Sequence, residues 1–357
     1  MLPRVGNISI LGNSLEALVQ KLAEKLPPGW RIVGTRSTDR RAVDRCVDAI
    51  LKIRGPRGNA GSVLVQAKAH LEPKDVASLR VTPRTPSSPQ VLIVAPFISV
   101  RAQERLKARG FSYADLTGNV RLVLSTPGLF IETSGAVQNP APTPRERKSL
   151  KGPKAGRIVR ALCDFRPPVG LRELAKRAGV DAGYASRIIA LLDREALVTR
   201  QKRGPITQTD WAALIRRWSQ QYSPFHPPRV AWYLAPRGMT QVLERLATLS
   251  ARYAVSGSWA AAQFASVSPT RLLLCYADDV ASVARDLDMR PAEAGANMAL
   301  VKPLDSVVYQ RTSQKKGITV AAVSQIAVDL LGSPGRGPNE AEALIEWMRE
   351  NEHVWRI

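Results

Sequence analysis

The stretch LRELAKRAGVDAGYASRIIALLDREALVTRQKRGPITQ, residues 171–208, decides the fold of the middle of this chain. Its apolar spacing predicts a helix over Leu171 to Ala178, a short turn that begins at Gly179, and a helix over Ala182 to Glu195. A turn this short makes the two helices cross steeply. The side chains expected in the core between them are all apolar: Leu174, Ala175, Val180, Ile188 and Leu192.

The flanking sequence completes this segment. A helix is predicted over Gly156 to Phe165, and strands over Leu197 to Arg203 and Ile206 to Gln208 form a hairpin around Gly204-Pro205. The segment resembles the winged-helix domains of bacterial transcription regulators, in which a helix-turn-helix precedes a hairpin. The resemblance implies that the last helix lies in the major groove of DNA and that the hairpin contacts phosphates or a minor groove.

The residues that would contact DNA follow from this arrangement. Asp181 can cap the last helix, whose first turns present Tyr184, Ser186 and Arg187 outward. Arg187 could form a bidentate pair with a guanine edge. The hairpin offers four further polar side chains: Arg200, Gln201, Lys202 and Arg203. The alternative interpretation is a three-helix module with a solvated basic face that contacts another protein.

The distribution of charge favours nucleic acid. The chain has 52 Lys and Arg against 30 Asp and Glu, a formal net charge of +22. The net charge is +10 over residues 1–135, +11 over residues 136–228 and only +1 over residues 229–357. An excess confined to two thirds of the chain is expected of a protein with a polyanionic partner, and we expect double-stranded DNA.

Composition also bears on membrane, disulfide and metal-binding classes of protein. No apolar run approaches the roughly 18 residues of a membrane span, since the longest, Val91 to Val100, contains Pro96. We therefore expect a cytoplasmic, nucleoid-associated protein without a membrane partner. Cys46, Cys163 and Cys275 lie far apart in the sequence, which predicts reduced, buried thiols. With three histidines in addition, no metal site and no cofactor are expected.

Composition also divides the chain. Residues 136–154 are rich in Pro, Lys and Arg and have almost no large apolar residue, so they are predicted to be a basic linker. They follow a first domain, residues 1–135, and precede the winged-helix domain, residues 155–222. A Pro-rich run then separates off a third domain, residues 229–357.

The first domain is predicted to be mixed α/β. Its expected elements are helices at Ser14–Leu26 and Arg101–Arg109 and strands at Val47–Ile53, Ser62–Ala69, Val91–Ala95, Val120–Leu124 and Leu129–Thr133. This order resembles the restriction-endonuclease-like (PD-(D/E)XK) fold. The run Tyr113 to Val120 resembles a motif found with this domain in actinobacterial and antitoxin-like regulators, and its Gly118-Asn119 pair predicts a structural turn.

In the restriction-endonuclease-like family, an acidic residue and a Glu/Asp-x-Lys on the next strand bind a divalent metal. The resemblance places Asp48 and Lys68 on this pattern, with Gln66 where the second carboxylate would stand. A neutral amide is a poorer ligand than a carboxylate for a hard cation, which predicts a degenerate site. An ordinary ion pair between Asp48 and Lys68 is the other interpretation.

The third domain also alternates strands and helices. A strand at Arg252–Ser256, the pair Gly257-Ser258, a helix from Trp259 and a strand at Arg271–Tyr276 resemble the start of a nucleotidyltransferase-like fold. Active members carry Asp-x-Asp on that second strand to hold two metals. Here Asp278 and Asp279 lie beyond it, which predicts an inactive domain, although Gly257 and Ser258 could still cradle a phosphate.

Residues 155–357 as a whole resemble the type IV (AbiEi-type) antitoxin family, notably over Asn297 to Val308 and Ala321 to Leu331. The sequence therefore predicts a bacterial, sequence-specific DNA-binding transcription regulator that is not an enzyme. One alternative is a metal-dependent nuclease that uses Asp48 and Lys68, and another is an antitoxin that autoregulates its operon. Besides DNA, a second copy of the chain and a toxin protein are the candidate partners.

Overall fold

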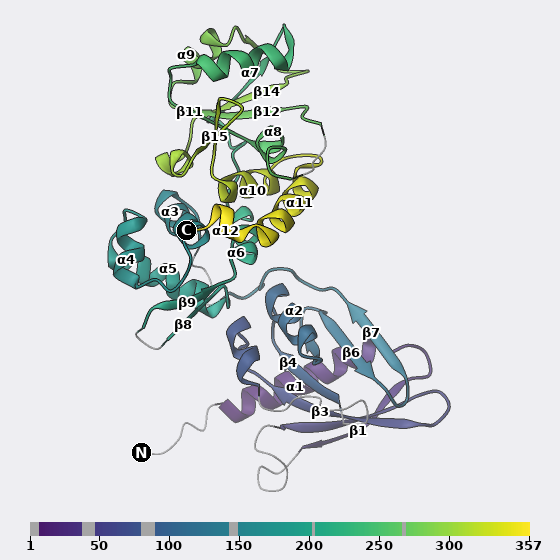
Figure 1. Cartoon of the computed structure of the whole chain (residues 1–357). Helices are drawn as coiled ribbons and strands as arrows, with labels where there is room; N and C mark the ends of the chain where they lie inside the picture. Colours follow the sequence, from purple (N-terminus) through teal and green to yellow (C-terminus); the bar gives the residue numbers. More distant parts are fainter. Residues whose placement is uncertain (1–6, 38–46, 80–89, 143–148, 202–203, 266–268) are drawn as a thin grey trace. The chain divides into compact units, whose positions relative to one another are not determined.

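The computed structural model describes residues 7–37, 47–79, 90–142, 149–201, 204–265 and 269–357 (Figure 1). The chain divides into two compact units. Unit 1 comprises Met1–Arg147 with Arg194–Ala196, and unit 2 comprises Lys148–Asp193 with Leu197–Ile357. Each unit contains a seven-stranded mixed sheet with helices, so the chain is mixed α/β, as the sequence predicts.

The sheet of unit 1 keeps its strands in chain order. Strands β3, β4 and β5 pair in parallel, and the outer pairs on both sides are antiparallel. The strands are β1 (Arg31–Ser37), β2 (Ala49–Arg54), β3 (Ala60–Ala67), β4 (Gln90–Ala95), β5 (Ser112–Asp115), β6 (Val120–Leu124) and β7 (Leu129–Thr133).

Helices cover both faces of this sheet. Helix α1 (Asn7–Glu24) packs Leu18 and Leu22 on one face, and α2 (Val100–Ala108) packs on the other with the 3-10 helix η1 (Pro73–Ser78). This arrangement explains why β4 is buried almost throughout, as expected of a central parallel strand. The sequence missed β1 and β5 and placed the start of α1 too late, at Ser14.

The turn between β5 and β6 is built around the buried carboxylate of Asp115, which is 1% exposed. The carboxylate accepts hydrogen bonds from the backbone N–H groups of Ile98, Thr117 and Asn119 at 2.8–3.1 Å and from the side chains of Thr117 and Asn119. Gly118 adopts a φ of +97°, which favours glycine. The structural role predicted for Gly118-Asn119 is confirmed.

Unit 2 begins with three helices and a hairpin. These are α3 (Pro153–Asp164), α4 (Leu171–Arg177), α5 (Ala182–Arg194), β8 (Val198–Arg200) and β9 (Ile206–Thr209). Val169 and Ile206 exchange two backbone hydrogen bonds, of 3.1 and 2.9 Å, which join the hairpin to the segment before α4. Helix α6 (Trp211–Ser219) follows and was missed in the sequence, although Asp210 caps it through the N–H of Ala213.

The sheet of unit 2 has the order β13-β10-β14-β12-β11-β16-β15. Figure 1 shows α7 and α9 on one side of it and α8, α10 and α11 on the other. The strands are β10 (Val230–Leu234), β11 (Tyr253–Ser256), β12 (Leu273–Ala277), β13 (Arg290–Pro291), β14 (Met298–Val301), β15 (Ser313–Lys315) and β16 (Ile318–Val320). The helices are α7 (Gly238–Thr248), α8 (Gly257–Ala261), α9 (Val280–Asp286), η2 (Ser306–Tyr309), α10 (Val323–Leu331), α11 (Gly337–Glu350) and α12 (Glu352–Trp355).

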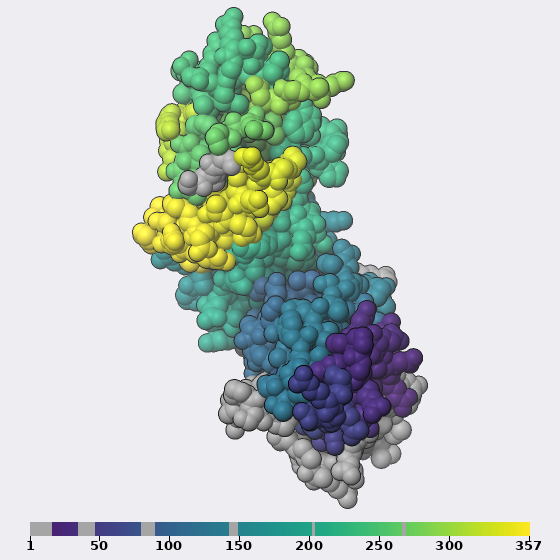
Figure 2. All heavy atoms as spheres, turned by 90° about the vertical axis from the view of Figure 1, so that its right-hand side faces the viewer, coloured from purple at the N-terminus to yellow at the C-terminus, as the bar shows by residue number. Residues whose placement is uncertain are grey.

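The three initial helices and the sheet of unit 2 share one hydrophobic core. The last residue, Ile357, exchanges backbone hydrogen bonds with Asp164 and Arg166, so the end of the chain lies beside the end of α3. Figure 2 shows α11 and α12, in yellow, lying against the teal helices of the middle segment. Unit 2 is therefore one packed body that contains the sheet and the segment 155–222 apart from Arg194–Ala196.

Two expectations from composition can be compared with the described residues. Cys163 and Cys275 are free and buried, as predicted, and Cys46 lies outside the described residues. Burial raises the pKa of both thiols, to about 12 for Cys275. In the described part of the chain, every helix is too short or too polar to cross a lipid bilayer.

Candidate nucleic-acid interface

Helix α5 has a buried face and an exposed face. Ala185, Ile188 and Leu192 are at most 6% exposed, and Leu174 and Ala175 of α4 pack into the same core. Val180 is half-buried against it, so the predicted core between the two helices is confirmed. The N–H of Tyr184 donates to Oδ1 of Asp181 at 2.6 Å, which confirms the predicted cap.

The first turns of α5 carry the predicted contact residues, and Tyr184 packs against the core of unit 2. Arg187 is exposed, and Tyr184 and Ser186 are half-buried. The guanidinium carbon of Arg187 lies 5.6 Å from the ring centroid of Tyr184, and Nζ of Lys154 lies 6.0 Å from the same centroid. Burial is the main reason that the pKa of Tyr184 is raised, so its hydroxyl stays protonated at neutral pH and can donate a hydrogen bond.

Lys154 is a residue that sequence reasoning missed. It lies in the stretch predicted to be a linker, yet α3 begins at Pro153, directly after Gly152. Proline at the first helical position is a common start signal, and it would have extended the helix to include Lys154. The structure therefore adds one exposed cation from α3 to the face formed by Tyr184 and Arg187.

The β8–β9 hairpin is described in part. Arg200 is half-buried and Gln201 is exposed at the tip, where the N–H of Gly204 donates to the carbonyl of Gln201 at 2.9 Å. Lys202 and Arg203, the two other predicted hairpin residues, lie outside the described residues. Strand β8 is shorter than predicted, since it ends at Arg200, whereas β9 extends one residue beyond the predicted end, to Thr209.

The turn between α4 and α5 is held by a residue of α3. Arg157 donates from Nη1 to the carbonyl of Gly179 at 3.3 Å, and from Nε and Nη2 to the carboxylate of Asp305 at 2.8–3.0 Å. Burial tends to raise the pKa of Asp305, but hydrogen bonds from Arg157 and from the N–H of Val307 hold it below its ordinary value. Arg157 thus links Asp305, directly before η2, to the turn before α5.

In unit 1, Asp48 and Gln66 lie beside each other at the ends of β2 and β3, because Ala49 pairs with Val65. Asp48 is exposed, and its Oδ2 accepts the N–H of Ala67 at 2.8 Å. Among the described residues, no ion pair joins Asp48 to Lys68, so that interpretation is wrong: the carboxylate instead holds the backbone of β3.

Gln66 is 6% exposed, and its Oε1 has no hydrogen-bond partner among the described residues. One exposed carboxylate and one buried amide are a poor donor set for a hard divalent cation. The described residues also contain no cluster of three or more His, Cys, Asp or Glu side chains that could hold a metal. These residues do not fit the metal that a restriction-endonuclease-like site requires.

Gly257 and Ser258, the candidate phosphate-binding pair of unit 2, have structural roles within the fold. The hydroxyl of Ser258 donates to Glu340, and Gly257 adopts a φ of +70° where the chain turns from β11 into α8. Asp278 accepts the hydroxyl of Tyr309 at 3.1 Å, and Asp279 caps α9. These polar groups stabilise the fold around β12, whose five residues are all buried.

Comparisons with protein-family models, with curated proteins and with solved structures found no match to this chain.

Proposed function

We propose that this protein is a sequence-specific double-stranded DNA-binding transcription regulator, and that α3 to β9 form a winged helix whose α5 reads the major groove. The observation that carries the proposal is the start of α5, where Arg187 is exposed, Ser186 is half-buried and Tyr184 is half-buried at the edge of the core. The net charge of +11 over residues 136–228 supplies a general attraction for DNA.

Two further features support this assignment. The order of three helices and a hairpin, with a single antiparallel β-bridge between Val169 and Ile206 of β9, is typical of winged-helix domains. The exposed cations Lys154, Arg172 and Lys176 come from α3 and α4, so basic groups flank α5 on the neighbouring helices. In such domains phosphate contacts set the position of the protein, and base contacts supply specificity.

The test compares two duplexes. A preferred duplex is selected from a random pool with the full-length protein, and a shuffled duplex serves as the reference, both at one salt concentration. We expect Arg187→Ala to cost about 1–3 kcal/mol on the preferred duplex and much less on the shuffled one, because a bidentate base contact is lost.

Arg172→Ala is the matched control, because it removes the same charge from the exposed surface of α4. It should weaken binding to both duplexes alike. Equal losses on both duplexes for Arg187→Ala would make Arg187 a phosphate contact and leave Ser186 or Tyr184 to read the bases. A selection that enriches no sequence would contradict sequence-specific binding itself.

A further inference from the structure

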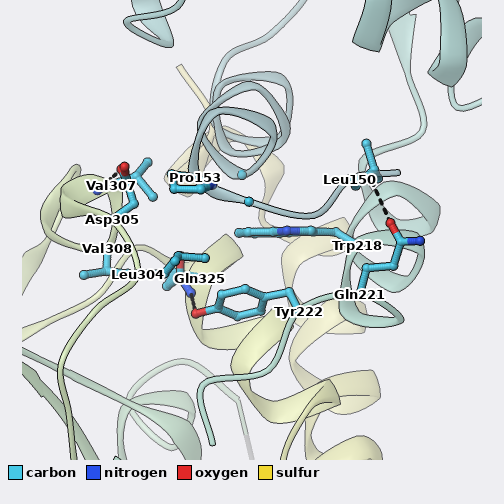
Figure 3. A pocket seen from close by; sticks show the side chains of 12 residues that line it. Leu150, Pro153, Trp218, Gln221, Tyr222, Leu304, Asp305, Val307, Val308 and Gln325 are labelled. Carbon is cyan, nitrogen blue, oxygen red and sulfur yellow. Dashed lines mark hydrogen bonds between the residues drawn. The ribbon is translucent and has the colours of Figure 1, made fainter. Parts of the chain in front are cut away.

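Asp305 lies on a firmly held segment of unit 2, directly before η2. The interior strand β14 ends at Val301, and all of its residues are buried. Val307 and Val308 of η2 are at most 5% exposed, and the N–H of Val307 donates to Oδ1 of Asp305 at 2.9 Å (Figure 3). The side chain of Asp305 is only 9% exposed, so buried neighbours on both sides fix its carboxylate.

Arg157 of α3 joins this carboxylate to the turn before α5. Its Nε and Nη2 donate to the two oxygens of Asp305 at 2.8–3.0 Å, and its Nη1 donates to the carbonyl of Gly179 at 3.3 Å. A planar guanidinium can bind a carboxylate through two donors and still offer a third in a fixed direction. The bidentate pair therefore keeps the third donor of Arg157 aimed at the turn.

Gly179 stands at the end of α4. It adopts a φ of +59°, and the N–H of Val180 donates to the carbonyl of Ala175 at 3.0 Å, which is typical of a helix C-terminus. A cation beside the last carbonyls of a helix is electrostatically favourable. Only Val180 and Asp181 separate Gly179 from α5, which begins at Ala182. The position of the Gly179 carbonyl therefore governs where α5 begins.

The guanidinium of Arg187 lies beside the first turn of α5. A Cβ atom at Gly183 would lie 3.8 Å from Nη1 of Arg187. A bidentate contact with a base tolerates little displacement, whereas phosphate contacts from long basic side chains set position without reading sequence. A loosened turn should therefore reduce discrimination between sequences more than it reduces the general affinity for DNA.

We propose that Arg157 and Asp305 are positioning residues, which hold the start of α5 in the orientation in which Arg187 reads bases. This role rests on the proposed function and extends it to a residue far from the helix-turn-helix in the sequence. Arg157 acts through Gly179, and Asp305 acts through Arg157.

Asp305→Asn in the full-length protein separates positioning from charge. The amide keeps the shape of the side chain, but its NH₂ group cannot accept a hydrogen bond from Arg157. Because the variant removes one negative charge, a purely electrostatic effect would strengthen binding to every duplex. We expect instead about a fivefold loss of affinity for the preferred duplex and less than about a twofold change for the shuffled one.

Glu342→Gln is the matched control. Glu342 of α11 accepts hydrogen bonds from Nε and Nη2 of Arg216 of α6, so a similar bidentate pair joins two helices outside the helix-turn-helix. The control removes the same charge and should change the affinity for both duplexes alike. If Asp305→Asn behaves like Glu342→Gln, Asp305 has no positioning role.

Arg157→Lys provides a second route to the same result. It keeps the charge but cannot bind both Asp305 and Gly179, so it should reproduce the selective loss on the preferred duplex. Thermal unfolding by circular dichroism checks that each variant is folded. A lower melting temperature together with equal losses on both duplexes would show a merely structural role.

A combined variant tests the route through Arg187. In a protein that already carries Arg187→Ala, Asp305→Asn should cause no further loss of discrimination, and a further loss of the same size would overturn this route. If no sequence is enriched, or if Arg187→Ala weakens both duplexes alike, base reading by Arg187 is wrong and its positioning falls with it. If Arg187→Ala reduces discrimination and Asp305→Asn does not, α5 reads DNA and only the positioning role is wrong.

Discussion

Asp115 in unit 1 and Asp329 in unit 2 are both buried carboxylates, and they are held in different ways. All donors to Asp115 come from the short stretch 98–119, and three of them are backbone N–H groups. Asp329 of α10 is held only by side chains: the hydroxyls of Ser256, Tyr276 and Tyr222 and the amide of Gln325, at 2.6–3.1 Å. One site is a local turn and the other is assembled by tertiary packing.

The difference has an electrostatic consequence for Asp329. Burial raises the pKa of Asp329 to about 6, although its four hydrogen-bond donors act in the opposite direction. These donors are neutral hydroxyl and amide groups, and they do not fully replace the water that a carboxylate loses on burial. A network of neutral side chains therefore leaves a buried carboxylate sensitive to mildly acidic pH.

The largest effect is expected for Asp115→Ala. The variant leaves the buried N–H groups of Ile98 and Asn119 without their acceptor, and each such group costs about 1–3 kcal/mol. We expect a loss of roughly 3–5 kcal/mol in the local stability of the β5–β6 turn. Hydrogen exchange of peptides that cover residues 98–136 measures this loss in the full-length protein.

Asp115→Asn is the control for this prediction, because its amide oxygen still accepts some of the same hydrogen bonds. It should lose clearly less protection than the alanine variant. If both variants exchange like the wild-type protein, the carboxylate does not hold the turn, and the contrast with Asp329 has no energetic basis.

The second prediction concerns pH. In the unfolded chain Asp329 titrates near its ordinary pKa of about 4, and in the folded protein near 6. Its contribution to the free energy of unfolding is therefore complete below pH 4, declines as the pH rises to about 6, and is constant above. The decline amounts to about 3 kcal/mol, since each pKa unit corresponds to about 1.4 kcal/mol.

Asp329→Asn removes this titration. The stability of the wild-type protein minus that of the variant should fall by about 3 kcal/mol between pH 4 and pH 7. Urea unfolding followed by tryptophan fluorescence at several pH values measures it, because six of the seven tryptophans lie after residue 200. A difference that does not change with pH would show that Asp329 has an ordinary pKa.

The same contrast explains what could be predicted from the sequence. The buried and exposed faces of α5, the cap at Asp181 and the turn at Gly118 depend on neighbours within a few residues. The structure confirms the buried face of α5, the cap and the turn, whereas of the three residues predicted to face outward only Arg187 is exposed. Helix α6 could also have been predicted from the sequence, because the N-cap residue Asp210 and the helical spacing of apolar residues in Trp211–Ser219 are local signals of a helix.

Contacts between distant segments could not be predicted in this way. Arg160 is 1% exposed and donates to Asp164, to the carbonyl of Val307 and to Gln325. Nothing in the sequence near Arg160 indicates partners about 150 residues away. The cluster around Asp329 has the same origin, since its donors come from β11, β12, α10 and the segment after α6, which only tertiary packing brings together.

The smallest of the three effects is expected for Ser256→Ala, which removes one donor from Asp329. A hydrogen bond to a charged group contributes about 1.5–3 kcal/mol and one between neutral groups about 1 kcal/mol. The variant should therefore lose about 2 kcal/mol at pH 7, where Asp329 is ionised, and about 1 kcal/mol at pH 4, where it is protonated. Ser333→Ala is the matched control, because the hydroxyl of Ser333 donates to the backbone carbonyl of Asp329 at 2.8 Å and not to the carboxylate. Its cost, measured by the same urea titrations, should be the same at both pH values. If the cost of Ser256→Ala is equally independent of pH, the hydroxyl does not stabilise the ionised carboxylate, and the distinction between local and assembled carboxylate sites loses its electrostatic part.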